Sequence, residues 1–348
     1  MGRVLRILLA GAVLLSLASM AEAKTITIKA VTAWPKSVWE VGNFTKFLDI
    51  VKERVAQKYP GQLEIQYAGG PEVIPNQEQV EAARMGVVDM VFTTDGYYVS
   101  AVPEVNALSV SMLDGWEERA KGVNAFLDKI HQEKVSCIYL GRLGHNLPFT
   151  IYLTKPVKGL EDLKGLKIRC SPTLIGFLKK IGANPVVIAP PEVYTALERG
   201  VVDGINMGVA TYSAWKLWGV MPHMVKANLF YGNINYMINK RKFDALSPAD
   251  QAALLAAARE SEVWLKPEYE KSVDTSIADA VKQGGTVTTL PLARSKAMVD
   301  SIAAKWKGEV DSSCGPELAG NALGPRKAEK RILTKRPVSR HRQEPCGG

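Results

Sequence analysis

Apolar and polar residues follow two different periods along the first third of the chain, and each period predicts a different kind of element. Residues 25–31 form a strand-like run, and residues 63–67 alternate as a half-buried strand. Between them we predict a helix with Ser37 as N-cap and Glu40 three residues later, the pattern of a capping box. The order strand, helix, strand is typical of an α/β fold. The helix would bury one face, made of Val41, Phe44, Leu48, Val51 and Val55.

A second pattern is an internal similarity between residues 78–89 and residues 192–203, which agree at six of twelve aligned positions. Each copy reads as a helix that ends at a glycine suited to a left-handed C-cap, Gly86 or Gly200, followed at once by an apolar strand. Junctions of this kind are common in α/β proteins, so chance similarity is one interpretation. The other is two lobes of similar construction with a ligand cleft between them.

A long helix is predicted to begin at Ser247-Pro248, a cap followed by proline at the first helical position. It extends to the glycines at 284 and 285, and Pro267 within it predicts a kink or a break. A helix of this length can lie across both lobes and brace them.

The two ends of the chain differ in composition from its body. Residues 1–23 have a basic start, a short apolar run and the small-residue site Ala21-Glu22-Ala23, the pattern of a secretory signal peptide, so we expect a mature chain from Lys24. The formal net charge of +9 comes mostly from residues 325–348, which hold eight basic and two acidic side chains. The body is therefore nearly neutral, which argues against nucleic acid as a partner, and residues 315–348 are predicted to be a disordered tail.

Several kinds of chemistry lack sequence support. The chain has no nucleophile-elbow, zinc-protease, phosphate-loop or dinucleotide fingerprint, and its four histidines are far apart. The four cysteines form no CxxC pair, and sequence cannot choose among their three disulfide pairings, so we expect Cys137 and Cys170 to be small buried residues in strands. We expect no cofactor, no metal and no catalysis.

One basic residue has an unusual setting. In the run from Leu166 to Cys170, apolar residues alternate with Lys167 and Arg169, which places Arg169 on the opposite face of a short strand from the apolar side chains. An arginine at such a position is usually solvated, and a ligand role is the alternative.

The segment from Lys155 to Gly204 resembles the solute-binding proteins of the tripartite ATP-independent periplasmic (TRAP) transporters, the DctP-like family. The resemblance rests on the run 163–169 (LKGLKIR), on 182–185 (GANP) and on 192–204 (EVYTALERGVVDG). Weaker similarity extends over about residues 24–310.

The resemblance implies a periplasmic protein of two α/β lobes that closes its interlobe cleft on a small organic acid and delivers it to the TRAP membrane permease subunits. It also implies that Arg169, which ends the Lys-Ile-Arg run, pairs with the substrate carboxylate. A planar guanidinium matches a carboxylate with two parallel charge-assisted hydrogen bonds.

Departures from the family pattern narrow the expected ligand. Some members place a second arginine about twenty residues before the first, where this chain has Phe149. Many members carry a polar contact where this chain has Met207, with Asn206 displaced by one position. Both departures favour a monocarboxylate with an apolar or aromatic body. By the same resemblance Asn76 and Thr94 would line the cleft, and the aromatic residues nearby add Trp34 and Tyr97 as candidate ligand contacts.

The prediction is therefore a periplasmic-binding-protein-like fold with a long bracing C-terminal helix, acting as a monomer. Two alternatives remain: a binding module that signals to a membrane sensor, and a secreted enzyme in which Arg169 orients a substrate and His145, expected in a loop, acts as base. The expected lobes are residues 24–146 plus 233–275 for lobe I, and 147–232 plus 276–314 for lobe II.

Overall fold

The computed structural model describes residues 25–36, 38–58, 63–111, 113–170, 174–188, 192–226 and 231–289. The predicted signal peptide, Ser37, Cys314, Cys346 and the basic tail lie outside these residues.

The first sheet is built largely from the N-terminal half of the chain. Its strand order is β2-β1-β3-β9-β4, with β1 parallel to β2 and β3, and with β9 antiparallel to β3 and β4. The strands predicted at 25–31 and 63–67 are confirmed as its first two members. The strand bounds are β1 Ile26–Thr32, β2 Leu63–Gly69, β3 Met90–Thr94, β4 Cys137–Leu153 and β9 Tyr231–Asn239.

The second sheet repeats the parallel arrangement. Strand β5 lies between β6 and β7, parallel to both, while β7 and β8 pair antiparallel with the end of β4 and β10 pairs with β8. The strand bounds are β5 Lys167–Cys170, β6 Asn184–Val187, β7 Gly204–Gly208, β8 His223–Lys226 and β10 Thr286–Thr289.

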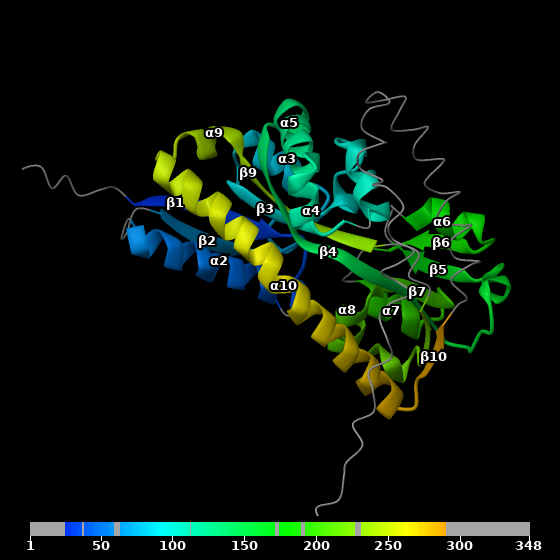
Figure 1. Ribbon diagram of the computed structural model, residues 1–348. Helices are drawn as coiled ribbons and strands as arrows, with labels where there is room; N and C mark the ends of the chain where they lie inside the picture. The colour runs from blue at the N-terminus through cyan, green and yellow to red at the C-terminus, as the bar shows by residue number, and fades with distance from the viewer. Residues whose placement is uncertain are drawn as a thin grey trace, which may run out of the picture.

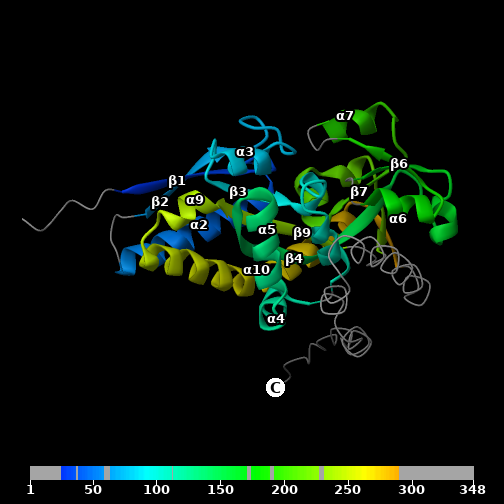
Figure 2. The ribbon, with the colours of Figure 1, turned by 90° about the horizontal axis from the view of Figure 1, so that it is seen from above.

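Strand β4 belongs to both sheets. Residues 137–148 pair with β9 of the first sheet, and residues 149–153 pair with β7 of the second. The loop expected around His145 is therefore wrong, because that residue lies inside the continuous strand, where shifts in register accommodate its Gly and Pro neighbours. The structure has two mixed α/β lobes, as predicted, and the two sheets lie at opposite ends of the molecule in Figure 2.

Helices cover both sheets. On the first sheet, α2 and α10 pack on one face and α3 and α5 pack on the other. On the second sheet, α6 packs on one face and α7 and α8 on the other. The helix bounds are α2 Trp39–Lys58, α3 Gln79–Met85, α4 Gly115–Ala120, α5 Val123–Val135, α6 Ile175–Lys180, α7 Val193–Glu198, α8 Val209–Ala214, α9 Lys240–Asp244 and α10 Pro248–Lys282. Short 3₁₀ turns connect them at η1 Asp95–Tyr97, η2 Pro103–Val110, η3 Leu160–Leu163 and η6 Leu217–Gly219.

The core face predicted for α2 is confirmed. Its apolar side chains are buried against β1 and β3, and only Leu48 stays partly exposed. Phe44 stacks on Phe92 of β3 at a centroid distance of 4.8 Å. The helix owes its position to this amphipathic face, since most helical stability in proteins comes from the tertiary packing of such a face.

The two similar segments adopt matching conformations. Gly86 and Gly200 are both left-handed, with φ of 78° and 65°, and each ends a helix. In both segments the aspartate that follows, Asp89 or Asp203, accepts a hydrogen bond from the first parallel strand through Oδ2, with Lys29 N and Lys167 N as donors at 2.8 Å. The two lobes therefore share one construction.

One detail of that similarity was predicted wrongly. The strands do not begin directly after the glycines but at Met90 and Gly204, because the intervening residues form a turn. The first valine of each turn, Val87 or Val201, is exposed, and the second is buried. The turn is needed to place the aspartate beside the neighbouring strand.

Helix α10 spans the molecule, as Figure 1 shows, and contacts α2 and α4 of the first lobe as well as α8 and β10 of the second. Ser247 caps it by accepting a hydrogen bond from the backbone N–H of Asp250 at 3.1 Å, as predicted. The break predicted at Pro267 is wrong, since the helix is continuous there. Pro267 and Val263, whose carbonyl loses its helical donor, are both exposed, so water can satisfy that carbonyl.

Candidate functional site

Arg169 is the third residue of the short strand β5. Its neighbours Ile168 and Cys170 are fully buried in the apolar cluster under α6, which places the arginine on the other face of the strand, as predicted. The side chain is nevertheless only 6% exposed. Its Nε donates to the carbonyl oxygen of Ile188 at 2.9 Å, and its Nη1 donates to that of Asn206 at 3.4 Å. Burial lowers the pKa of Arg169, although an arginine stays charged at neutral pH.

No acidic side chain among the described residues forms an ion pair with Arg169. Neutral carbonyl oxygens alone leave a buried positive charge incompletely compensated. The position can therefore accept an anionic group.

Tyr97 approaches this arginine from the other lobe. It lies in η1, the 3₁₀ turn directly after β3. Burial raises the pKa of Tyr97, and the electrostatic interaction with Arg169 opposes that rise. The phenol also shares a hydrogen bond with the side chain of Asn76. Three of the residues that we expected at the site, Arg169, Tyr97 and Asn76, are thus brought together from both sheets.

Glu40 belongs to the same neighbourhood and was not predicted there. Its Oε1 accepts a hydrogen bond from Thr211 Oγ1 of α8 at 2.7 Å, and its charge interacts with Tyr97. Its other oxygen, Oε2, is buried and has no hydrogen-bond partner among the described residues. Burial raises the pKa of Glu40. A glutamate in the first turn of a helix usually indicates capping, so the sequence held no signal for this contact.

Thr94 is the last residue of β3, and Trp34 lies two residues after the end of the neighbouring strand β1. Trp34 is partly exposed, and its ring packs against Phe92 at a centroid distance of 5.6 Å. The hydroxyl of Thr94 donates to Asp95 Oδ1 at 2.9 Å, which fixes the start of the turn that carries Tyr97. Both residues lie at carboxyl ends of parallel strands, where ligands of α/β folds bind.

The residues expected to form an apolar wall lie on β4 and β7. Met207 is buried in the large core cluster, and Asn206 contacts Arg169 only through its main-chain carbonyl, because its side-chain amide donates to the carbonyl of Thr150 at 3.4 Å. In the strand register Phe149 pairs with Gly208, whereas Met207 pairs with Thr150.

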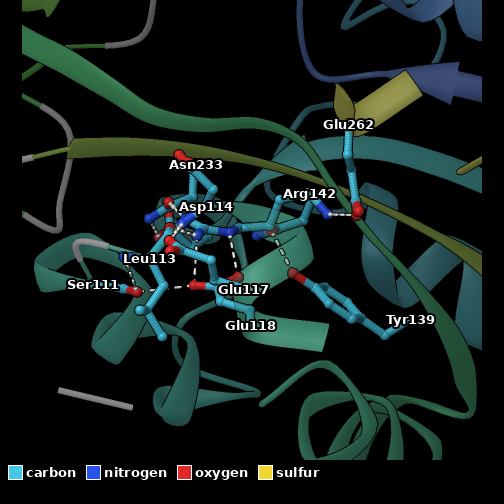
Figure 3. Close-up of polar contacts among 11 residues, drawn as sticks. Ser111, Leu113, Asp114, Glu117, Glu118, Tyr139, Arg142, Asn233 and Glu262 are labelled. Atoms are coloured by element: carbon cyan, nitrogen blue, oxygen red, sulfur yellow. Dashed lines mark hydrogen bonds and ion pairs between the residues drawn. The ribbon is translucent and has the colours of Figure 1, made fainter. Parts of the chain in front are cut away.

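A buried ionic network around Arg142 is connected to the turn that carries Tyr97, and nothing in the sequence pattern indicated it. Figure 3 shows Arg142 with Glu118 and Asn233. Arg142 of β4 is paired with Glu118 of α4, with Nε to Oε2 at 3.0 Å and Nη2 to Oε1 at 2.5 Å. The same guanidinium donates through Nη1 to Asn233 of β9, and Asn233 donates to Asp95 Oδ2 at 3.0 Å. The chain of contacts links the crossover strand β4 to Asp95, two residues before Tyr97.

Within the part of the chain that the structure describes, no three His, Cys, Asp or Glu side chains are grouped so that they could hold a metal ion. Cys170, beside Arg169, is a free, buried cysteine, and burial raises its pKa to about 11, which leaves it a weak nucleophile at neutral pH. No helix in the described residues has the length and apolar character required to cross a membrane.

Comparisons with known proteins agree with this architecture. The model of the DctP family, the bacterial extracellular solute-binding proteins of family 7, matches residues 33–312. The chain is 28% identical over 269 residues to the 2,3-diketo-L-gulonate-binding periplasmic protein of Escherichia coli, covering 74% of this chain and 78% of that one. It is 26% identical over 257 residues to the monocarboxylate 2-oxoacid-binding periplasmic protein of Nostoc sp., covering 69% of this chain and 67% of that one.

A solved TRAP periplasmic solute-binding protein from Ochrobactrum anthropi is 26% identical in sequence and superimposes with a TM-score of 0.74, covering 90% of this chain and all of that one. The match covers both lobes and the long helix, so the likeness concerns the whole described fold. The family model and this fold show that the chain belongs to the DctP family of periplasmic solute-binding proteins, family 7 of the bacterial extracellular solute-binding proteins.

Proposed function

We propose that this protein is the receptor of a TRAP transporter, that it binds an organic acid through Arg169 without catalysing a reaction, and that it delivers the acid to the membrane permease as a monomer. The observation that carries the proposal is the buried guanidinium of Arg169, which has two carbonyl acceptors and no ion-pair partner among the described residues. From the opposite lobe Tyr97 interacts electrostatically with Arg169, and the same phenol shares a hydrogen bond with Asn76.

The energetics favour closure on an anion. In the closed arrangement without ligand, an arginine that is desolvated and unpaired costs on the order of 3–5 kcal/mol. A carboxylate accepts two parallel hydrogen bonds from the guanidinium and removes most of that cost, so the ligand stabilises the closed state more than the open one. The moving units are the lobes expected from the sequence, 24–146 plus 233–275 and 147–232 plus 276–314. Strand β4 supports that division, because its pairing changes sheet between residues 148 and 149.

The ligand class is a monocarboxylate with an apolar or aromatic body. Phe149 and Met207, the positions that departed from the family pattern, carry no charge for a second carboxylate. A second buried anionic group would therefore lack a partner, which proteins avoid. The names of two relatives, a 2,3-diketo-L-gulonate-binding protein and a monocarboxylate 2-oxoacid-binding protein, support a carboxylate with oxygen near the acid group.

The test is a thermal-shift screen of the purified protein with matched series of monocarboxylates, 2-oxo acids and dicarboxylates. We expect at least one monocarboxylate to raise the melting temperature, and Arg169→Ala to abolish that shift. Arg199→Ala serves as the matched control, because Arg199 is an exposed arginine of the same lobe. Retention of the shift in Arg169→Ala, or a response confined to dicarboxylates, would contradict the proposal.

A further inference from the structure

Glu40 and Thr211 make a buried polar contact between the two lobes. Helix α2, which carries Glu40, connects β1 and β2 of the first sheet, whereas α8, which carries Thr211, follows β7 of the second. The hydroxyl of Thr211 donates to Glu40 Oε1 at 2.7 Å, and neither residue is more than 9% exposed. Separation of the lobes would move α8 away from α2, break this bond and return the carboxyl group to water.

The surroundings of Glu40 suit a neutral carboxyl group better than a carboxylate. Besides Thr211, the groups that face it are the phenols of Tyr97 from η1 and of Tyr269 from α10. No lysine or arginine forms an ion pair with Glu40 in the described part of the chain, and Oε2 has no hydrogen-bond partner there. The carboxyl group also has a hydrogen bond with the backbone N–H of Glu40 itself, which favours the charged form, but burial outweighs both hydrogen bonds and raises the pKa. A buried carboxylate without a cation beside it is disfavoured relative to its protonated form.

We propose that Glu40 is a proton-dependent latch: as the lobes close, its carboxylate takes a proton from water, and the neutral acid accepts the hydrogen bond from Thr211. The inference rests on the lobe closure of the proposed function. It gives Glu40 a role separate from that of Arg169, because the latch stabilises the closed state whether or not a carboxylate is bound.

The direction of the pH effect follows from burial. In the open state Glu40 is solvated, with a pKa near that of a free glutamate, and in the closed state burial raises the pKa. The closed state therefore binds the proton more tightly, so closure is favoured as the pH falls and disfavoured as it rises. A single proton changes the ratio of closed to open molecules by at most about tenfold per pH unit.

The experiment measures lobe separation without any added ligand. Spin labels at Lys52→Cys in α2 and Lys179→Cys in α6, both exposed, report the distance between the lobes by pulsed EPR. Cys314→Ser and Cys346→Ser keep the labelling specific, since Cys137 and Cys170 are buried. The closed population is compared at pH 5 and pH 8.

We expect the closed population of the labelled protein to rise severalfold from pH 8 to pH 5, and that of the same protein with Glu40→Gln to be equal at both. Thr211→Val should lower the closed population at both pH values, and Thr211→Ser should restore it. If Glu40→Gln fails to fold, Thr211→Val still tests the contact, because it removes the hydroxyl group that donates to Glu40.

An equal pH response with and without Glu40→Gln, or no response in either, would overturn the latch. Because no ligand is present, this result is independent of the carboxylate screen. A protein that binds no carboxylate yet shows the Glu40-dependent response would refute the proposed ligand and retain the latch.

Discussion

The two lobes each bury an arginine, and the two side chains differ in what compensates their charge. Arg142 of the first lobe is 1% exposed and donates to both carboxylate oxygens of Glu118, to Asn233 and to the carbonyl of Leu113. Arg169 of the second lobe is 6% exposed and donates to two carbonyl oxygens. Burial is common to both arginines, so the difference between them is the anionic partner, and the binding role proposed for Arg169 rests on that difference.

The largest expected effect is the loss of stability when Arg142, whose charge is paired with that of Glu118, is replaced. Arg142→Met leaves Glu118 buried without its ion pair, so we expect the free energy of unfolding to fall by about 3–5 kcal/mol. Urea denaturation followed by circular dichroism measures the loss.

The matched control is Arg142→Met combined with Glu118→Met, which removes both charges and leaves an apolar pair. It should be less destabilised than the single variant, because no carboxylate is left buried without a cation. Equal losses would mean that side-chain packing, rather than charge compensation, is what Arg142 contributes.

A third buried basic side chain extends the comparison, since it is held as a neutral group. His131 of α5 is fully buried, its ring contacts the carbonyl of Leu127 at 2.7 Å and the hydroxyl of Tyr98 at 3.2 Å, and burial lowers its pKa to about 4. In the unfolded chain His131 binds a proton near pH 6.5, whereas in the folded protein it stays neutral down to a lower pH. The contribution of His131 to the free energy of unfolding is therefore present in full above pH 6.5. It falls by about 3 kcal/mol as the pH drops toward 4.

Urea midpoints measured from pH 7 to pH 4 test this slope. His131→Gln keeps a polar side chain without a titrating group, so the part of the slope between pH 6.5 and 4 that belongs to His131 should disappear in that variant. A variant that keeps the full slope would assign it to other groups.

The sequence was informative where a local pattern decides the structure. Strand alternation placed Arg169 opposite Ile168 and Cys170, and the glycine and aspartate of each repeated segment adopt matching roles in both lobes. These features depend on neighbours within a few residues or on one adjacent strand. The predicted face of α2 follows from the same kind of local rule.

The features that the sequence did not reveal depend on residues far apart in the chain. Arg142 and Glu118 are 24 residues apart, and Glu40 and Thr211 are 171 apart. No periodicity in the sequence relates residues so far apart. Glu40 was therefore predicted only as part of a capping box, and no role was predicted for Arg142. The same reason explains Pro267, where exposure of the helix face, unknown from the sequence, decides whether the helix breaks.

Adding a charge at Phe149 sharpens the comparison in the second lobe, because some members of the family carry a second arginine there. Phe149→Arg would place a second cation on β4, at the position that pairs with Gly208. We expect affinity for an apolar monocarboxylate to fall by about tenfold or more, because the new charge must be desolvated on closure without a partner. Isothermal titration with the monocarboxylate found by thermal shift measures the change.

Phe149→Leu is the control, since it shortens the side chain without adding charge, and it should bind more tightly than the arginine variant. A variant Phe149→Arg with unchanged affinity would place this residue outside the binding site.

The smallest expected change concerns the stability of the protein without ligand when Arg169 is replaced. Arg169→Met removes a buried charge that has only carbonyl acceptors, and the methionine retains much of the apolar stem. We expect the free energy of unfolding to stay within about 1 kcal/mol of the original or to rise, in contrast to the loss at Arg142. Urea denaturation of both variants under one set of conditions makes the comparison direct. A loss at Arg169 as large as that at Arg142 would show that its carbonyl partners compensate the charge fully, and the basis for assigning it to ligand binding would be gone.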